Sequence, residues 1–326
     1  MRRRFLIPLI LLAACGREDE AATAEAPERV EPVVVYATYE DREYLPMFFG
    51  EFTKETGVPV TVRHGDLEVI MQDVLESRVD PYADVVIVPS VVDAWRLSEE
   101  GALRPMQLEL PRVPAALRDP DGYWAAIGGD YPVVISAKSN DIGFSVSEFT
   151  ELADPKFAGK LCLPSSGHRI SQNLIAELVF RDGPRPAELV VRGWVANLAQ
   201  PVYADQRELV EALIAGKCQI AIASLSTIAS FQDAVPIMQI VIHPTPVTPM
   251  GIDIEAIGVN RHAENPDGGR QLIKWLAGGN RDMEFSMHTG RQAPDWFSDM
   301  TIVVSQSRLA QLNEDAVKLA ERARYR

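Results

Sequence analysis

The feature that most constrains the fold is an alternation of short apolar runs with amphipathic segments at the start of the chain. Residues 33–37, 58–62 and 83–88 are rich in β-branched residues and are expected to be strands. Each is followed by a segment whose apolar residues have helical spacing, and Gly57 and Gly101 suit helix ends. Near-continuous apolar strands that alternate with helices predict a parallel sheet covered on both faces. The chain is therefore expected to be an α/β protein.

A segment that resembles a crossing between two lobes follows at residues 119–136. It contains a turn-rich stretch, a glycine pair and a proline that leads into an apolar run. Further strands are expected at 161–163 and 218–223, and residues 252–259 are expected to return the chain to the first lobe. Two such crossings make a hinge, and ligands of open α/β proteins bind where the connectivity changes. We therefore expect two doubly wound lobes with a ligand cleft beside residues 128–132.

The crossings also predict the domain boundaries. The first lobe is expected to contain residues 33–131 and 253–300, and the second lobe residues 132–252 and 301–326. Helices are expected near 147–152, 169–181, 186–199, 208–215, 266–277, 280–288 and 308–323, and a further short strand at 240–243.

The N-terminus has the form of an export signal that ends at a lipid-attachment cysteine. Three arginines precede an apolar run that is too short to span a bilayer, and the sequence LAACG around Cys15 resembles the bacterial lipobox. Residues 1–14 are thus expected to be a signal peptide. Residues 15–32 are expected to be a lipidated cysteine with a flexible tether, because they are rich in Ala, Glu and Pro. This predicts a protein of the periplasm or cell envelope that is anchored by lipid, and the alternative is a cleaved soluble signal.

Two cysteines lie beyond the tether, Cys162 and Cys218. In an oxidising compartment they can pair. Both begin apolar runs of the second lobe, and the starts of neighbouring parallel strands lie close enough for a disulfide. We therefore expect a disulfide between them.

Charge and motifs exclude several functions. The formal net charge of -14 argues against nucleic acid as a partner. The sequence has no G-x-G-x-x-G, Walker, G-x-S-x-G, C-x-x-C or H-E-x-x-H motif, and its 5 histidines are scattered. The chain is thus expected to be a monomer without enzymatic activity and without a cofactor.

Several blocks, in order, resemble the periplasmic ferric-iron-binding class of ABC-transporter substrate-binding proteins. They are KETGVPVTV with GDLEVI, ADVVIVPSVVDAWRLSEEGALRP, LRDPDGYW, LADPKFAGKLCLPSSG, WVANLAQP and IAGKCQIAIAS. The resemblance covers residues 33–290 and implies the type II periplasmic-binding-protein fold, in which two α/β lobes joined by β-strand hinges enclose a ligand. It also implies delivery of that ligand to an ABC permease with its ATPase.

The resemblance fails at the expected iron ligands. The iron binders of this class carry two adjacent tyrosines after the strand that reads CQIAIA here, and these positions fall on Ser226 and Thr227. The position of a first-strand histidine falls on Tyr39 or Glu40. A carboxylate commonly follows the third strand, where this chain has Pro-Ser, ending at Ser90.

The arginines that hold a synergistic anion at the hinge also have no counterpart, because their positions fall on Asp130 and Pro132. What remains is a cleft with carboxylates and hydroxyls. The candidate ligand-binding residues of this kind are Tyr39, Glu40, Ser90, Asp130, Tyr131, Ser224, Ser226, Thr227, Asp253 and Glu255. Such a set suits a cation or a polyol better than an anion, although carboxylates are also ligands for hard metal ions.

One turn favours an anion instead. Ser165, Ser166 and the amides around Gly167 precede an apolar helix, and Arg169 adds positive charge. A plain capping role for Ser165 or Ser166 is the alternative. With acidic and anion-binding groups together, a zwitterion or a metal–anion complex also fits.

The sequence thus predicts an extracytoplasmic solute-binding lipoprotein of an ABC importer. Its cargo is Fe(III) or, alternatively, an organic cation, a zwitterion or a polyol. A ligand sensor for a membrane receptor is a further alternative.

Overall fold

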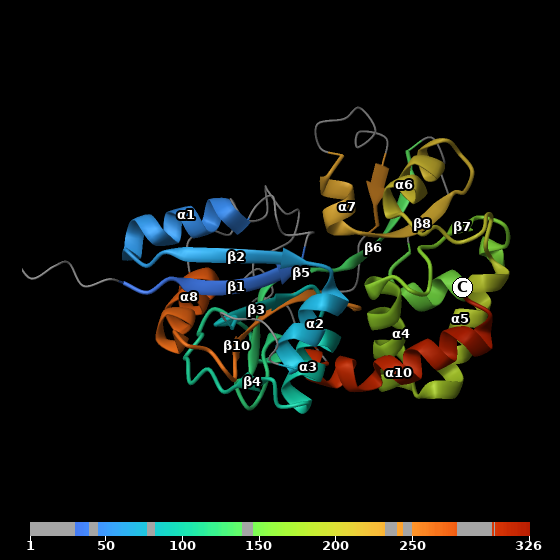
Figure 1. Cartoon of the computed structure of the whole chain (residues 1–326). Coiled ribbons are helices and arrows are strands. Elements are labelled where there is room, and N and C mark those ends of the chain that lie inside the picture. Colours follow the sequence, from blue (N-terminus) through green and yellow to red (C-terminus); the bar gives the residue numbers. More distant parts are fainter. Residues whose placement is uncertain are drawn as a thin grey trace, which may run out of the picture. The chain divides into compact units, whose positions relative to one another are not determined.

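A computed structural model describes residues 30–38, 45–76, 82–138, 146–231, 240–243, 250–278, 302 and 304–326 of the chain. The predictions for Cys15, Tyr39, Glu40 and the helix near 280–288 lie outside these residues. The described part from Glu31 onward belongs to one compact unit, which contains two sheets (Figure 1).

The first sheet has the order β2-β1-β3-β10-β4, and β5 also pairs with β10. Its strands are β1 (Val33–Thr38), β2 (Val60–Gly65), β3 (Val85–Val88), β4 (Leu103–Arg104), β5 (Trp124–Asp130) and β10 (Asp253–Asn260). The first three strands are parallel, as predicted, but β10 runs antiparallel to β3, β4 and β5. The chain leaves this sheet after β5, and β10 returns to it in the opposite direction.

Four helices pack around the first sheet: α1 (Leu45–Thr56), α2 (Leu67–Glu76), α3 (Val91–Glu99) and α8 (Pro266–Gly278). Figure 1 shows α2 and α3 next to each other. The core beneath them is apolar and includes the fully buried side chains of Phe52, Ile87 and Trp124. Ser90 caps α3, because its side chain accepts a hydrogen bond from the amide of Asp93.

The second sheet has the order β7-β8-β6-β9. Its strands are β6 (Pro132–Ala137), β7 (Leu161–Cys162), β8 (Ile220–Ser224) and β9 (Ile240–Ile242). The helices around it are α4 (Arg169–Asp182), α5 (Pro184–Ala196), α6 (Gln206–Ile214) and the short α7 (Leu225–Ala229), with 3-10 turns at Phe149–Ala153 and Pro155–Phe157. The predicted helix at 147–152 is thus a 3-10 turn.

The predicted disulfide is confirmed. Cys162 ends β7, which pairs in parallel with β8, and Cys218 lies two residues before β8 begins. Their Cα atoms are 5.9 Å apart and the sulfurs are bonded. The disulfide therefore joins two neighbouring strands across a sequence separation of 56 residues.

The chain passes from the first sheet to the second between β5 and β6. β5 ends at Asp130 in the first sheet and β6 begins at Pro132 in the second. The half-buried Tyr131 between them packs against the cores of both sheets. The return passes from β9 in the second sheet to β10 in the first, so two crossovers join the two lobes.

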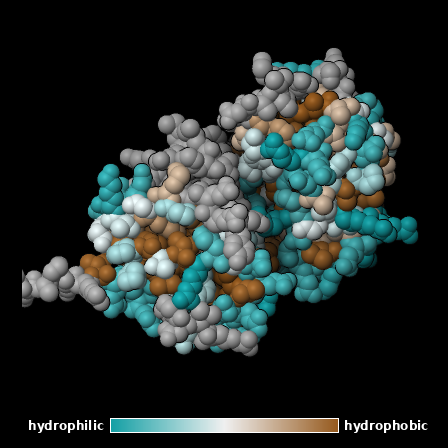
Figure 2. All heavy atoms as spheres, turned by 45° about the horizontal axis from the view of Figure 1, so that its top comes forward, coloured by the Kyte–Doolittle hydropathy of each residue, from teal (hydrophilic) through white to brown (hydrophobic). Residues whose placement is uncertain are grey.

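The C-terminal helix α10 (Gln306–Ala323) packs against α3 near the first sheet and against α4 and α5 near the second. None of the helices in the described ranges is both long enough and apolar enough to cross a membrane. The face shown in Figure 2 is mostly hydrophilic, with hydrophobic residues in smaller groups, in keeping with the strongly acidic composition.

Candidate ligand-binding site at the crossovers

The two crossovers bring three predicted acidic residues onto one strand pair. In the antiparallel pairing of β5 with β10, Asp253 lies opposite Asp130, and Glu255 lies opposite Gly128. Directly opposed residues and residues two apart on a strand share a face of a sheet, so the three carboxylates project to the same side. Asp130 and Asp253 are each 6% exposed and Glu255 is 0% exposed. Buried carboxylates need hydrogen-bond or ionic partners. Neighbouring helices provide them for Asp130 and Asp253.

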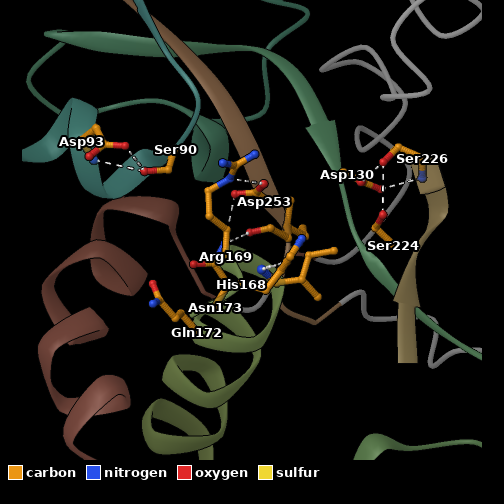
Figure 3. A network of polar contacts seen from close by, with 12 residues as sticks. Ser90, Asp93, Asp130, His168, Arg169, Gln172, Asn173, Ser224, Ser226 and Asp253 are labelled. Carbon is orange, nitrogen blue, oxygen red and sulfur yellow. Dashed lines mark hydrogen bonds and ion pairs between the residues drawn. The ribbon is translucent and has the colours of Figure 1, made fainter. Parts of the chain in front are cut away.

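The first turn of α7 holds Asp130. One carboxylate oxygen, Oδ1, accepts hydrogen bonds from the amides of Tyr131 at 2.8 Å and Ser226 at 3.1 Å. The Ser226 hydroxyl donates to the other oxygen, Oδ2 (Figure 3). The hydroxyl of Ser226 is therefore bonded to a carboxylate of the crossover.

The other two hydroxyls of this segment are bonded within the turn. Ser224 caps α7: its Oγ accepts from the amide of Thr227 at 3.1 Å and donates to the Thr227 hydroxyl at 2.7 Å. The amide of Ser224 donates to Gln206 Oε1 at 2.6 Å, and Gln206 Nε2 lies 2.8 Å from the His168 ring nitrogen Nε2. The hydroxyl cluster at 224–227 is thus an ordered polar network, which sequence reasoning treated as a set of separate ligand groups.

The first residue of α4 holds Asp253. Arg169 Nε lies 3.1 Å from Asp253 Oδ2, and the Arg169 side chain is 33% exposed (Figure 3). Asn173, one turn further along α4, donates from Nδ2 to the carbonyl of Ile252 at 2.9 Å and approaches Asp253 Oδ1 at 3.5 Å. The predicted residues Arg169 and Asp253 are therefore brought together, across 84 residues of sequence.

Asp93 joins this group, although the sequence analysis did not select it. The Ser90 hydroxyl donates to Asp93 Oδ2 at 2.6 Å. Burial raises the pKa of Asp93, the Ser90 hydrogen bond and the positive charge of Arg169 oppose this, and the negative charge of Asp253 adds to it. The charges of Arg169 and Asp253 therefore both act on the Asp93 carboxyl. The only signal in the sequence was the position of Asp93 three residues after the capping serine.

The turn before α4 has partners different from those expected. The amide of Ser165 donates to the carbonyl of Tyr203 at 2.7 Å, and the amide of Ser166 donates to the carbonyl of Arg326 at 2.9 Å. The N-cap of α4 is His168, whose ring nitrogen Nδ1 accepts from the amide of Ile170 at 3.3 Å. The alternative that Ser165 or Ser166 caps this helix is therefore wrong. Gly167 lies in the same turn, beside Arg169.

The charged residues around the crossovers have a definite chemical character. They combine the carboxylates of Asp93, Asp130, Asp253 and Glu255 with the guanidinium of Arg169, and Tyr131 lies beside them at the first crossover. Among the described residues, no group of three or more His, Cys, Asp or Glu side chains is arranged to hold a metal ion. The carboxylates suit the recognition of an ammonium group, and a guanidinium is a group that binds carboxylates and phosphates.

Comparisons with known proteins agree with this architecture. No protein-family model matches the chain. Iron uptake protein A1 of Synechocystis sp. is 28% identical over 218 residues, which cover 66% of this chain and 60% of that protein. Iron uptake protein A2 of the same organism is 22% identical over 297 residues, covering 87% of this chain and 84% of that protein. The chain thus matches less than two thirds of the length of the first relative.

Solved structures show the same fold. The Trichodesmium protein FutA in complex with iron and citrate aligns with a TM-score of 0.80 at 22% identity, covering 90% of this chain and 100% of that one. The Bordetella ferric binding protein also aligns with a TM-score of 0.80 at 22% identity, covering 90% of this chain and 99% of that one. The chain therefore has the two-lobed α/β fold of periplasmic binding proteins, and its resemblance to the ferric-iron-binding class is confirmed. These relatives are named for uptake and binding, in agreement with the prediction that the chain is not an enzyme.

Proposed function

We propose that this chain is the extracytoplasmic solute-binding protein of an ABC importer. It captures a small ligand between its lobes, residues 33–131 with 253–300 and residues 132–252 with 301–326, and passes it to a permease driven by an ATPase. The fold, the export-signal form of residues 1–14 and the names of the sequence relatives support this role. Acylation of Cys15 attaches the protein to a membrane, and the tether to residue 32 separates the binding domain from it.

We propose further that the cargo is an organic cation or zwitterion. The observation that carries this proposal is the Asp130–Ser226 contact, because the residue at an expected tyrosine position donates its hydroxyl to a crossover carboxylate. An alcohol is far less acidic than a phenol and does not replace a tyrosinate as an Fe(III) ligand. The buried carboxylates of Asp253 and Glu255 add negative charge at the crossovers for an ammonium group, and Arg169 pairs with the negative end of a zwitterion.

Iron is the second candidate, because both sequence relatives are named as iron uptake proteins. In this case Tyr39 and Tyr131 supply the phenolates in place of the adjacent pair. Binding would then depend on both tyrosines and would give a visible charge-transfer band.

Calorimetric titration separates the two candidates. The full chain is titrated with ferric citrate and with a panel of amines, zwitterions and polyols, beside Asp253→Asn and the double variant Tyr39→Phe, Tyr131→Phe. The proposal predicts binding of an amine or zwitterion that Asp253→Asn weakens at least tenfold and that the double tyrosine variant retains, since an unpaired buried charge costs ~2 kcal/mol or more. Tight ferric citrate binding that is lost in the tyrosine variant would instead establish iron as the cargo.

A further inference from the structure

The second crossover is held along its length by one face of α4. Four α4 side chains spaced four residues apart contact four consecutive residues of the crossover. Arg169 contacts Asp253, Asn173 contacts Ile252, Glu177 contacts Gly251, and Arg181 contacts Met250. Residues four apart lie on one face of a helix, so these contacts form a continuous row, which we name the α4 clamp.

The centre of the α4 clamp is buried and closely packed. The amide of Gly251 donates to Glu177 Oε2 at 2.8 Å, and the exposed fractions of Asn173 and Glu177 are 4% and 3%. Gly251 has a φ of +67°, and a Cβ atom at this position would lie 3.1 Å from the backbone of Leu174. The crossover backbone therefore lies directly against the α4 backbone, with no space for a side chain between them.

The side-chain lengths match the geometry of the α4 clamp. The α4 residues span 12 helical steps, or about 18 Å, whereas the three residue steps of the crossover span at most about 10 Å. The first and last side chains of the row therefore have to extend towards the centre of α4 to contact the crossover. Both are arginines, Arg169 and Arg181, whose side chains are long enough to do so. The shorter Asn173 and Glu177 occupy the centre, where the two segments are closest.

We propose that α4 and residues 250–253 move as one rigid body, and that Asn173 and Glu177 are positioning residues that fix the Asp253 carboxylate at the binding site. Bending of the second crossover then falls within β10, directly after its first residue, Asp253. Asp253 thus keeps a fixed place relative to Arg169 when the lobes rotate. The part of this inference that concerns the ligand rests on the proposed function, because Asp253 is one of its binding groups.

Hydrogen exchange measured by mass spectrometry on the ligand-free, full-length protein tests the α4 clamp. In the double variant Asn173→Ala, Glu177→Ala, the amides of residues 250–253 are expected to exchange roughly 30-fold faster, because two buried hydrogen bonds of ~1 kcal/mol each are lost. The α4 amides are expected to exchange as in the wild type. Glu177→Gln keeps an oxygen acceptor for the Gly251 amide, so this variant is expected to restore slow exchange when compared with Glu177→Ala.

Gln172→Ala is the matched control. Gln172 is also an α4 residue, but it bonds Asn313 of α10 at 3.0 Å and not the crossover, so its loss should leave exchange at 250–253 unchanged. Unchanged exchange at 250–253 in the double variant would overturn the inference, as would an equal rise throughout α4. Because hydrogen exchange is measured without ligand, its result does not depend on the outcome of the titrations. A failed titration panel would reject the proposed function alone.

Discussion

Glu177 gives a quantitative prediction about the pH dependence of stability. Its carboxylate is buried in α4; one oxygen accepts the Gly251 amide, and the other has no hydrogen-bond partner in the described part of the chain. Burial raises the pKa of Glu177 from 4.5 to about 7, and the Gly251 hydrogen bond and the charge of Arg181 offset this only in part. The folded state therefore binds this proton more tightly than the unfolded state does.

The sign and the magnitude of the pH dependence of stability follow from this difference in proton affinity between the two states. Below pH 4.5 the Glu177 carboxyl is protonated in both the folded and the unfolded state, and its ionisation does not lower the free energy of unfolding. As the pH rises towards 7, the carboxyl ionises first in the unfolded state, so the free energy of unfolding falls. Each tenfold change in proton affinity corresponds to about 1.4 kcal/mol, so the loss reaches ~3 kcal/mol above pH 7. Glu177→Gln removes this titration. The variant is therefore expected to gain up to ~3 kcal/mol relative to the wild type between about pH 5 and pH 8.

Urea unfolding of both proteins at several pH values, with the disulfide intact, measures this gain. The difference between the variant and the wild type isolates Glu177 from every other titrating group. Gln172→Ala, which changes the same helix without changing an ionisable group, is expected to show a difference that is constant with pH. A difference between Glu177→Gln and the wild type that stays constant within ~0.5 kcal/mol over this range would refute the reasoning.

Three further predictions concern other parts of the chain. Replacing Cys162 and Cys218 by serine should cost on the order of 4 kcal/mol of stability by the chain-entropy model, and two free thiols titrated in the unreduced, denatured wild type would refute the disulfide. Cys15→Ser should release the protein from membranes without lowering its melting temperature, and a loss of stability comparable to that of a core mutation would show that residues 16–32 pack on the domain. Ser90→Ala should cost about 1 kcal/mol in chemical unfolding, because it removes the cap of α3, and an unchanged midpoint would show that the cap contributes nothing.

The parts of the fold with local signals could be predicted from the sequence. β-Branched runs identified β1 and β3. The glycine pair and the proline identified the first crossover. The disulfide followed from two cysteines that precede or end neighbouring strands. In each case the physical cause lies within a few residues of the element itself.

The features that could not be predicted from the sequence depend on contacts between distant segments. β10 is antiparallel because it returns from the second sheet, and its own sequence does not encode that direction. His168 caps α4, and the amide of Ser166 in the preceding turn is bonded to Arg326, at the far end of the chain. The Ser226–Asp130 contact joins residues 96 positions apart, and no periodicity or motif signals such a pair.

The most direct test of the central claim is native mass spectrometry, combined with metal analysis, of the full-length protein purified without added ligand. Closure of the lobes retains cargo through purification when release is slow. The proposed function predicts that the retained mass is an organic cation or zwitterion, that iron is absent and that the protein is colourless. A stoichiometric iron content with a visible charge-transfer band would contradict it.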